Sequence, residues 1–160
     1  MNEFLMRLEI ALKNLPDNPK PQCKGFYLAY YYKYGDTLTV EKIGDVPVEK
    51  QMKYFQFAVK KVMQTLSFGK IRSKEFENDT LEQYPGAITL INGCAGVSGH
   101  ESMIDEAIST LWLIAIHNSG SMSNFNNWEV FLETARIIGE SVAPDNKFIP
   151  IIAKLMTEQK

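Results

Sequence analysis

The sequence predicts a single α/β domain in which helices flank a small antiparallel β-sheet. Residues 26–43 combine aromatic residues with alternating polar and apolar positions, which is typical of a β-hairpin. Residues 48–68 and 128–156 instead repeat apolar residues at helical spacing. With 160 residues, 45% of them hydrophobic, the chain is long enough for one core and too short for two ordinary domains. Because a hairpin must bury one face on helices to be stable, we expect an α/β sandwich.

The predicted elements alternate between helices and strands and end in helices. In chain order they are helix 2–14, strands 26–34 and 37–43, helix 48–68, strand 87–97, helix 100–117 and helices 128–142 and 148–156. This order fits a profilin-like sandwich with extra C-terminal helices. Helix 2–14 then precedes a core over 24–118, and a helical extension over 124–157 follows it.

Three segments need separate interpretation. Residues 87–97 are interpreted as one continuous strand, although Asn92-Gly93 is also typical of a tight hairpin turn. Residues 70–85 are interpreted as a surface loop with one helical turn near Glu82. Helix 48–68 is strongly amphipathic. Its apolar face comprises Met52, Phe55, Val59, Val62, Met63 and Leu66.

Asn92–Glu101 concentrates the features that form ligand pockets. Three glycines, spaced three residues apart, let the backbone approach another group, and the helix expected next offers free N–H groups and a positive dipole end. The alternative is a capping box, in which the side chains of Ser98 and Glu101 each bond to the backbone of the other residue. The candidate ligand-binding residues are Gly96, Ser98, Gly99 and His100.

Other reactive residues provide few candidates for chemistry. His100 beside Glu101 is an acid–base candidate, and its alternative is an exposed residue in a first helical turn. His117 lies 17 positions further along the same predicted helix, so the two histidines cannot share a metal ion, and we predict no metal site. No catalytic residue is assigned.

The cysteines and one acidic pair have structural interpretations. Cys94 in a strand is expected to act as a small hydrophobic residue, and Cys23 as a second free thiol. Asp105 and Glu106 are adjacent on a helix and diverge by about 100°, so we expect a solvated face.

Charge and hydropathy exclude several classes of partner. Seventeen basic and 19 acidic residues leave no basic excess, which argues against nucleic-acid binding. The longest apolar run, 111–116, is far shorter than the roughly 20 residues that cross a bilayer, so no membrane association is expected. The mixed first 20 residues lack a signal-peptide core, and we predict a cytoplasmic location.

Aromatic content predicts a homodimer. Nine Phe, seven Tyr and two Trp, with a helix that is apolar on every side from Trp112, exceed what one small sheet covers. Surplus apolar surface of this kind commonly forms a two-fold interface. The alternative is that the C-terminal helix folds back and covers the same surface within one chain.

Several motifs together identify a family resemblance. Gly93-Cys94-Ala95-Gly96-Val97-Ser98-Gly99, followed by Asp105-Glu106-Ala107, resembles the G-A-I-G-V-S-G strand and D-E-x-x-A helix of the GlcG/HbpS-like haem-binding family. The segments 35–38 and 42–47 resemble that family's strand, turn and R-M-D-G-A-P sequence, and the resemblance covers about residues 26–115. It implies a profilin-like sandwich that often forms oligomers, with members linked to haem or to cobalamin-associated systems.

These observations favour a non-catalytic protein that binds or senses a small ligand, with haem as the cofactor that the resemblance implies. Two alternatives stay open. One is a protein–protein interaction module, and the other is a small enzyme that uses His100 and Glu101.

Overall fold

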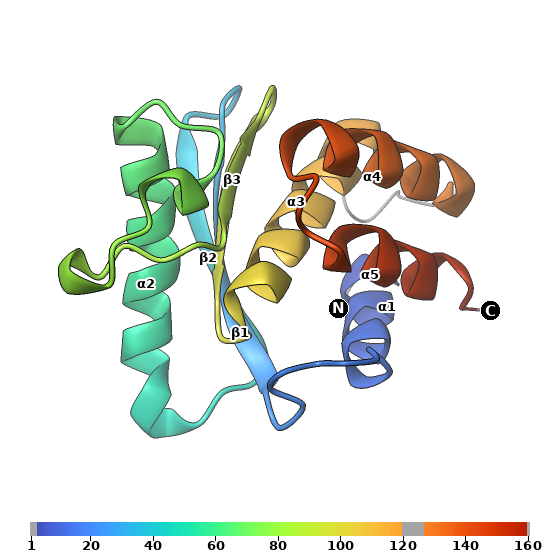
Figure 1. The fold of residues 1–160 in the computed structure, drawn as a ribbon, viewed down its shortest axis with the longest axis horizontal. Coiled ribbons are helices and arrows are strands. Elements are labelled where there is room, and N and C mark those ends of the chain that lie inside the picture. The colour runs from blue at the N-terminus through green and yellow to red at the C-terminus, as the bar shows by residue number, and fades with distance from the viewer. Residues whose placement is uncertain (1–2, 120–126, 160) are drawn as a thin grey trace.

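The structure is a computed structural model that describes residues 3–119 and 127–159. Its helices are α1 (Glu3–Lys13), α2 (Val48–Ser67), α3 (Ser102–Ser119), α4 (Trp128–Val142) and α5 (Phe148–Thr157). Its strands are β1 (Lys24–Tyr32), β2 (Thr37–Asp45), β3 (Ala87–Leu90) and β4 (Gly93–Ser98). Figure 1 shows α2 on one side of the sheet and the other helices on the opposite side. The predicted α/β sandwich is confirmed.

The sheet is antiparallel throughout, with strand order β2-β1-β4-β3. Phe26 pairs with Ile43, and Leu28 pairs with Val97, so these apolar side chains share one face. They belong to the main core under α3. Ala29 and Cys94 lie on the opposite face, in a small cluster under α2. The sheet therefore separates a large core from a small one.

The segment before α3 forms a hairpin, so the continuous strand expected over 87–97 is wrong. β3 ends at Leu90, residues 91–92 make a two-residue turn, and Leu90 pairs with Gly93. The turn is held in place because Asn92 accepts a hydrogen bond from the Lys33 N–H at 3.0 Å. A Cβ at Gly93 would lie 2.0 Å from the carbonyl oxygen of Tyr31, so only glycine fits there.

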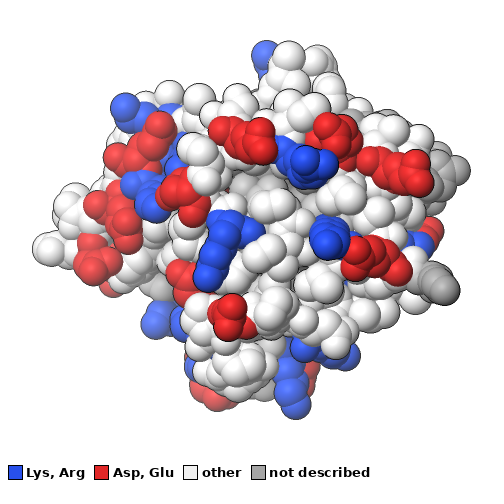
Figure 2. Space-filling model, turned by 45° about the vertical axis from the view of Figure 1, so that its right-hand side comes forward, with Lys and Arg blue, Asp and Glu red and all other residues white. Residues whose placement is uncertain are grey.

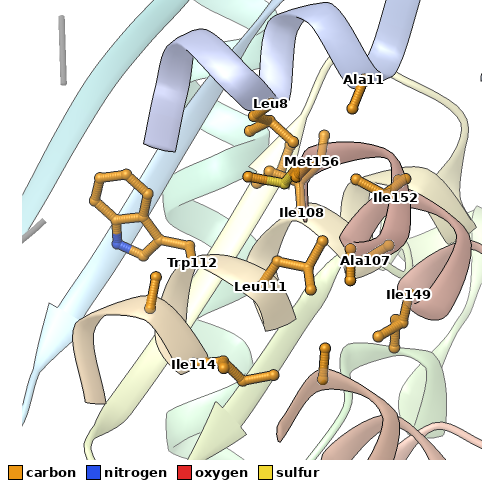
Figure 3. Packing of buried hydrophobic residues seen from close by; sticks show 14 of the residues in the cluster. Leu8, Ala11, Ala107, Ile108, Leu111, Trp112, Ile114, Ile149, Ile152 and Met156 are labelled. Atoms are coloured by element: carbon orange, nitrogen blue, oxygen red, sulfur yellow. The ribbon is translucent and has the colours of Figure 1, made fainter. Parts of the chain in front are cut away.

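The C-terminal helices cover α3. Figure 3 shows Ile149, Ile152 and Met156 of α5, with Leu8 of α1, around the apolar side chains of α3. The side chains 112–116, which are apolar on every side, are buried inside one chain. This arrangement confirms the fold-back alternative for α3 and removes the surface on which the dimer prediction was based.

Helix α2 contacts the sheet through a different side from the one that its apolar periodicity predicts. Its buried residues are Ala58, Lys61, Val62 and Thr65. Four residues of the predicted apolar face are exposed: Met52, Phe55, Met63 and Leu66. The reason lies in the sheet, because a Cβ at Gly96 would be only 3.0 Å from the carbonyl oxygen of Ala58. Because the sheet has a glycine at this point, the helix packs close to it, and only small side chains of α2, such as Ala58, fit in the contact.

The segment 70–85 contains two short 3-10 helices, η1 (Ser73–Phe76) and η2 (Asp79–Leu81). The turn predicted near Glu82 is therefore present, one residue earlier. Arg72 forms an isolated bridge with Ile88 and so covers the outer edge of β3. Helix α3 ends at Ser119, and the break predicted at 118–121 lies partly outside the described residues.

No helix in the described part of the chain is long and apolar enough to cross a membrane. On the face that Figure 2 shows, Lys and Arg side chains lie among Asp and Glu side chains and do not gather into one basic patch.

Candidate functional site

The predicted site lies where β4 leads into α3. Ser98 ends β4 by pairing with Tyr27, and Gly99, His100 and Glu101 connect it to the helix. The capping box of Ser98 and Glu101 is wrong, because Ser98 belongs to the sheet and the helix begins only at Ser102. The Glu101 carboxylate instead accepts a hydrogen bond from the Met103 N–H at 3.0 Å.

A polar pocket opens beside the start of α3, and we call it the α3 pocket. Its volume is about 230 Å³. Helix α2 contributes Tyr54, Phe57 and Lys61 to its walls. The opposite wall includes Ser98, Gly99, His100, Ser102 and Asp105. Three of the four predicted ligand-binding residues therefore line one pocket.

A larger pocket of about 510 Å³, the α1 pocket, lies on the other side of His100. Its walls come from α1, from the segment before β1 and from the end of β2, and Leu12, Phe26 and Ile43 make it largely apolar. His100 lines both pockets. His100 therefore borders both an apolar space and a polar one.

The His100 side chain is 6% exposed, which contradicts the alternative of an exposed helical residue. Its ring packs on Phe26 with a centroid distance of 5.6 Å. Burial, with a smaller contribution from Lys20, lowers the pKa of His100 to about 4. The imidazole is therefore neutral near pH 7. Its Nδ1 atom is buried without a hydrogen-bond partner in the described structure.

Lys61 and Asp105 form a buried ion pair in the wall of the α3 pocket. The Lys61 Nζ lies 3.3 Å from Asp105 Oδ2 and donates to the Val97 carbonyl oxygen at 2.6 Å. The second oxygen of Asp105 accepts from the His100 N–H at 2.9 Å. Burial raises the pKa of Asp105 to about 7, although Lys61 opposes that shift, and burial lowers the pKa of Lys61.

Glu106 is also buried, so the solvated acidic face predicted for Asp105 and Glu106 is wrong. The guanidinium of Arg72 donates to both Glu106 oxygens, at 2.9 and 2.7 Å. Asn146 donates to Glu106 at 2.9 Å, and Arg72 also pairs with Asp145 at 2.7 Å. These bonds join the segment before β3 to α3 and to the α4–α5 connection. Because Asp105 and Glu106 point in different directions from α3, their carboxylates pair with different residues, Lys61 and Arg72.

The glycines of the site have different roles. Gly99 has a φ of +154°, and a Cβ there would lie 2.8 Å from the Gly25 carbonyl oxygen, so the chain needs glycine to turn between the two pockets. Gly96 lies under α2 and is absent from the walls of both pockets described above. Its contribution is close packing of the helix on the sheet.

Neither cysteine thiol hydrogen-bonds to an imidazole or a carboxylate among the described residues, although Cys23 lines the α1 pocket with His100. Cys94 is fully buried, and burial raises the pKa of its thiol to about 11. The Cys23 thiol donates to the Gly99 carbonyl oxygen at 3.0 Å, and partial burial raises its pKa too. His117 is exposed near the end of α3. No group of three His, Cys, Asp or Glu side chains within residues 3–119 and 127–159 could hold a metal ion.

The α3 pocket does not fit haem. Nδ1 of His100 is enclosed, so Nε2 is the ring nitrogen left to bind an iron, and the ring packs on Phe26. The α3 pocket, at about 230 Å³, lies below the range of about 300–1,000 Å³ typical of drug-sized ligands. The larger α1 pocket has the carboxylates of Glu9 and Asp45 in its wall, beside its apolar residues.

Comparisons of the chain with protein-family models, with curated proteins and with solved structures return no match.

Sequence reasoning missed Lys61 and Asp105. The available signal was Lys61 itself, because it falls on the same helical side as Ala58, Val62 and Thr65. A lysine among small residues on a packed face needs a buried partner. Asp105 lies in the first turn of α3, where an acidic residue is expected to be exposed to solvent, and the sequence alone does not indicate its burial.

Proposed function

We propose that this protein is a non-catalytic small-ligand-binding or sensory protein whose site is the α3 pocket. One observation supports it above the others: Ser98, Gly99 and His100 line a single pocket together with the buried Lys61–Asp105 pair. A cavity that brings together a few polar side chains with shifted pKa values, as for His100 and Asp105, is typical of a ligand-binding site. Cytoplasmic location and the lack of a nucleic-acid partner remain predictions from the sequence.

A ligand screen tests the proposal. Purified protein is screened by thermal shift against small molecules, and each stabilising compound is then tested on two variants. His100→Phe keeps a ring on Phe26 and removes both ring nitrogens, whereas His117→Phe makes the same change at an exposed position outside both pockets. We expect the stabilisation to disappear in His100→Phe only. A compound that stabilises both variants equally binds elsewhere and contradicts the proposed site.

Haem is included because the family resemblance implies it. We expect no saturable Soret shift on titration, because the α3 pocket, at about 230 Å³, is too small for the macrocycle. A shift that saturates with wild type and is lost in His100→Phe would contradict this expectation.

The enzyme alternative has less support. Glu101 is absent from the walls of both described pockets, and its carboxylate bonds to the Met103 N–H. His100 therefore lacks the acid–base partner that the alternative requires.

A second candidate is an interaction module in the form of a homodimer. The observation behind it is the exposed apolar stripe of α2, in which Met52 is 68% exposed and Met63 is 50% exposed. An antiparallel pair of α2 helices centred on Val59 would place Met52 opposite Leu66 and Phe55 opposite Met63. The stripe is thus self-complementary, as a two-fold interface requires.

Light scattering tests the dimer. We expect twice the chain mass of 18.2 kDa for wild type and the monomer mass for Met63→Glu. Met6→Glu, on α1 and 53% exposed in wild type, is the matched control and should stay dimeric. A wild-type protein of monomer mass at high micromolar concentration would contradict the dimer.

A further inference from the structure

The Lys61 side chain carries an amine that is buried and yet lines a pocket. Its ammonium has three N–H groups, and the structure describes two acceptors for it. These are the Val97 carbonyl oxygen at 2.6 Å and Asp105 Oδ2 at 3.3 Å. The third N–H has no partner among the residues that the structure describes. The chain therefore leaves one side of this nitrogen without an acceptor.

Ser98 is a second buried polar group in the same wall. Its side chain lies on the α2 face of the sheet with that of Cys94, because the two residues are four positions apart in β4. Ser98 is 5% exposed and lines the pocket with Lys61. Its hydroxyl forms no hydrogen bond with any residue that the structure describes. Buried hydroxyl groups are normally hydrogen-bonded, so an unpartnered one in a pocket wall indicates a ligand atom that bonds to it.

The Lys61–Asp105 pair holds a proton that either residue can carry. Burial lowers the pKa of Lys61 and raises that of Asp105 to about 7. Both shifts favour the uncharged forms, and the Nζ and Oδ2 atoms are 3.3 Å apart. A desolvated, uncharged lysine is a nucleophile toward carbonyl carbon, whereas an ammonium group is not. A protonated carboxyl beside it can act as the acid of the same reaction.

We infer that the α3 pocket binds a small aldehyde through a reversible imine between the carbonyl carbon and Lys61 Nζ. This inference rests on the proposed function and names its ligand class. The Ser98 hydroxyl is the donor for the carbonyl oxygen, on which negative charge develops during the attack. A volume of about 230 Å³ limits the aldehyde to a small one.

The reaction conserves atoms and charge. The Lys61 nitrogen attacks with its lone pair, the carbon–oxygen π bond breaks, and Asp105 gives its proton to the oxygen. Asp105 then takes a proton back from the nitrogen, which leaves a neutral carbinolamine. When Asp105 returns that proton to the hydroxyl group, water leaves and the nitrogen lone pair forms the second bond of a protonated imine. The product again has one positive charge beside the Asp105 carboxylate, so the buried ion pair is retained.

Reductive trapping on the full chain tests the inference. The protein is incubated at about pH 7 with acetaldehyde and sodium cyanoborohydride, which reduces a protonated imine to a stable amine. Peptide mass spectrometry then locates the modified residues over time. Lys60 is the internal control, because it is the next residue of α2, lies outside the pocket walls and is 37% exposed against 7% for Lys61. A reaction governed by exposure alone would modify Lys60 first.

We expect Lys61 to be modified at least about tenfold faster than Lys60, because only Lys61 is desolvated beside an acid. Ser98→Ala removes a hydroxyl without a described partner, so folding is preserved, and it should slow modification of Lys61 about tenfold. Ser67→Ala, an exposed serine at the end of α2, is the matched control and should change neither rate. Lys61→Arg keeps a cation for Asp105 and should abolish the fast addition to the whole chain.

Three results would overturn the inference. They are modification of Lys60 as fast as that of Lys61, a fast addition that persists in Lys61→Arg, and equal rates at Lys61 in wild type and Ser98→Ala. The first is measured on the wild-type protein alone, so it does not depend on the folding of any variant.

The ligand screen separates the two proposals. If a compound without a carbonyl group stabilises wild type but not His100→Phe while Lys61 reacts no faster than Lys60, the aldehyde inference fails and the proposed function stands. If no screened compound depends on His100 and Lys61 reacts no faster than Lys60, both fail.

Discussion

Lys61 and Asp105 meet inside the protein with their charged atoms 3.3 Å apart, although 44 positions separate them in the chain. Lys61 comes from α2 and Asp105 from α3, the helices that cover opposite faces of the sheet (Figure 1). The pair reaches around the end of β4, where Lys61 also donates to the Val97 carbonyl oxygen. It therefore joins the two helical layers at the wall of the α3 pocket.

Removing one member of this pair should cost more than removing both. Lys61→Met leaves the buried Asp105 carboxylate without its cation, and we expect a loss of about 3–5 kcal/mol in the free energy of unfolding. The double variant Lys61→Met/Asp105→Leu, measured by urea denaturation at pH 8, should be more stable than Lys61→Met alone. Lys60→Met, which removes an exposed pair with Glu82 and an exposed hydrogen bond to the Leu81 carbonyl oxygen, should cost under about 1 kcal/mol. Equal losses for Lys61→Met and Lys60→Met would rule out a strong buried pair.

The pH dependence of stability should include a contribution from Asp105. Its pKa is raised from 3.8 to about 7 in the folded state, so folded protein holds a proton that unfolded chains release between these values. The stability due to this carboxyl is therefore fully present below pH 3.8 and is lost as pH rises through about 7. Three groups face the Asp105 carboxyl: the Lys61 ammonium from α2, the His100 N–H, which donates to it, and the charge of Lys20 from the α1–β1 connection. Asp105→Asn should flatten the decline in melting temperature between about pH 4 and pH 7. A decline of the same slope in both proteins would contradict the assignment.

Packing of α2 on β4 should depend on Gly96. A Cβ there would lie 3.0 Å from both the Ala58 carbonyl oxygen and Val62 Cγ2, so Gly96→Ala must displace the helix. We expect a cost of about 1–3 kcal/mol by urea denaturation. Gly35→Ala is the control, because the new methyl group would meet its nearest atom at 3.4 Å, and its effect should stay within about 0.5 kcal/mol. Equal stability of the two variants would show that α2 does not pack tightly against β4 at Gly96.

The fork of Arg72 should not be replaceable by lysine. Its guanidinium donates to both oxygens of the buried Glu106 and also to Asp145. Arg72→Lys keeps the charge but loses the second bond to Glu106, and we expect a loss of about 1.5–3 kcal/mol in unfolding free energy. Arg136→Lys, on an exposed i,i+3 pair, should change little. Similar values for the two variants would mean that the fork contributes nothing beyond its charge.

Much of the fold was predictable because local patterns agree with the structure. The boundaries of α1, α4 and α5 follow from apolar spacing and from the prolines and polar residues between them. The β1–β2 hairpin follows from alternation around a Gly35-Asp36 turn. In contrast, the turn before Gly93 depends on close contact with the Tyr31 backbone, which only the folded sheet brings near.

The site was only partly predictable. The glycine-rich end of β4 leads to a pocket with Ser98, Gly99 and His100 in its wall, and ligand binding there stays a prediction. The amphipathic pattern of α2 gave the wrong buried face, because the small residues of β4 select Ala58 and Lys61 rather than the larger apolar side chains. That rotation also places Lys61 at the pocket. Such a choice depends on tertiary packing and has no signature within the helix itself.

The contacts between α1 and α5 have a consequence for the kinetics of folding. Arg7 donates to the Met156 and Gln159 carbonyl oxygens, and Gln159 donates back to the Arg7 carbonyl oxygen, across separations of 149 and 152 residues. Closing loops of that length is slow compared with forming local helices and hairpins. The local helices and the β1–β2 hairpin can therefore form before α5 docks on α3. A chain in which α5 has not docked exposes the apolar side of α3, and exposed apolar surface of this kind favours aggregation.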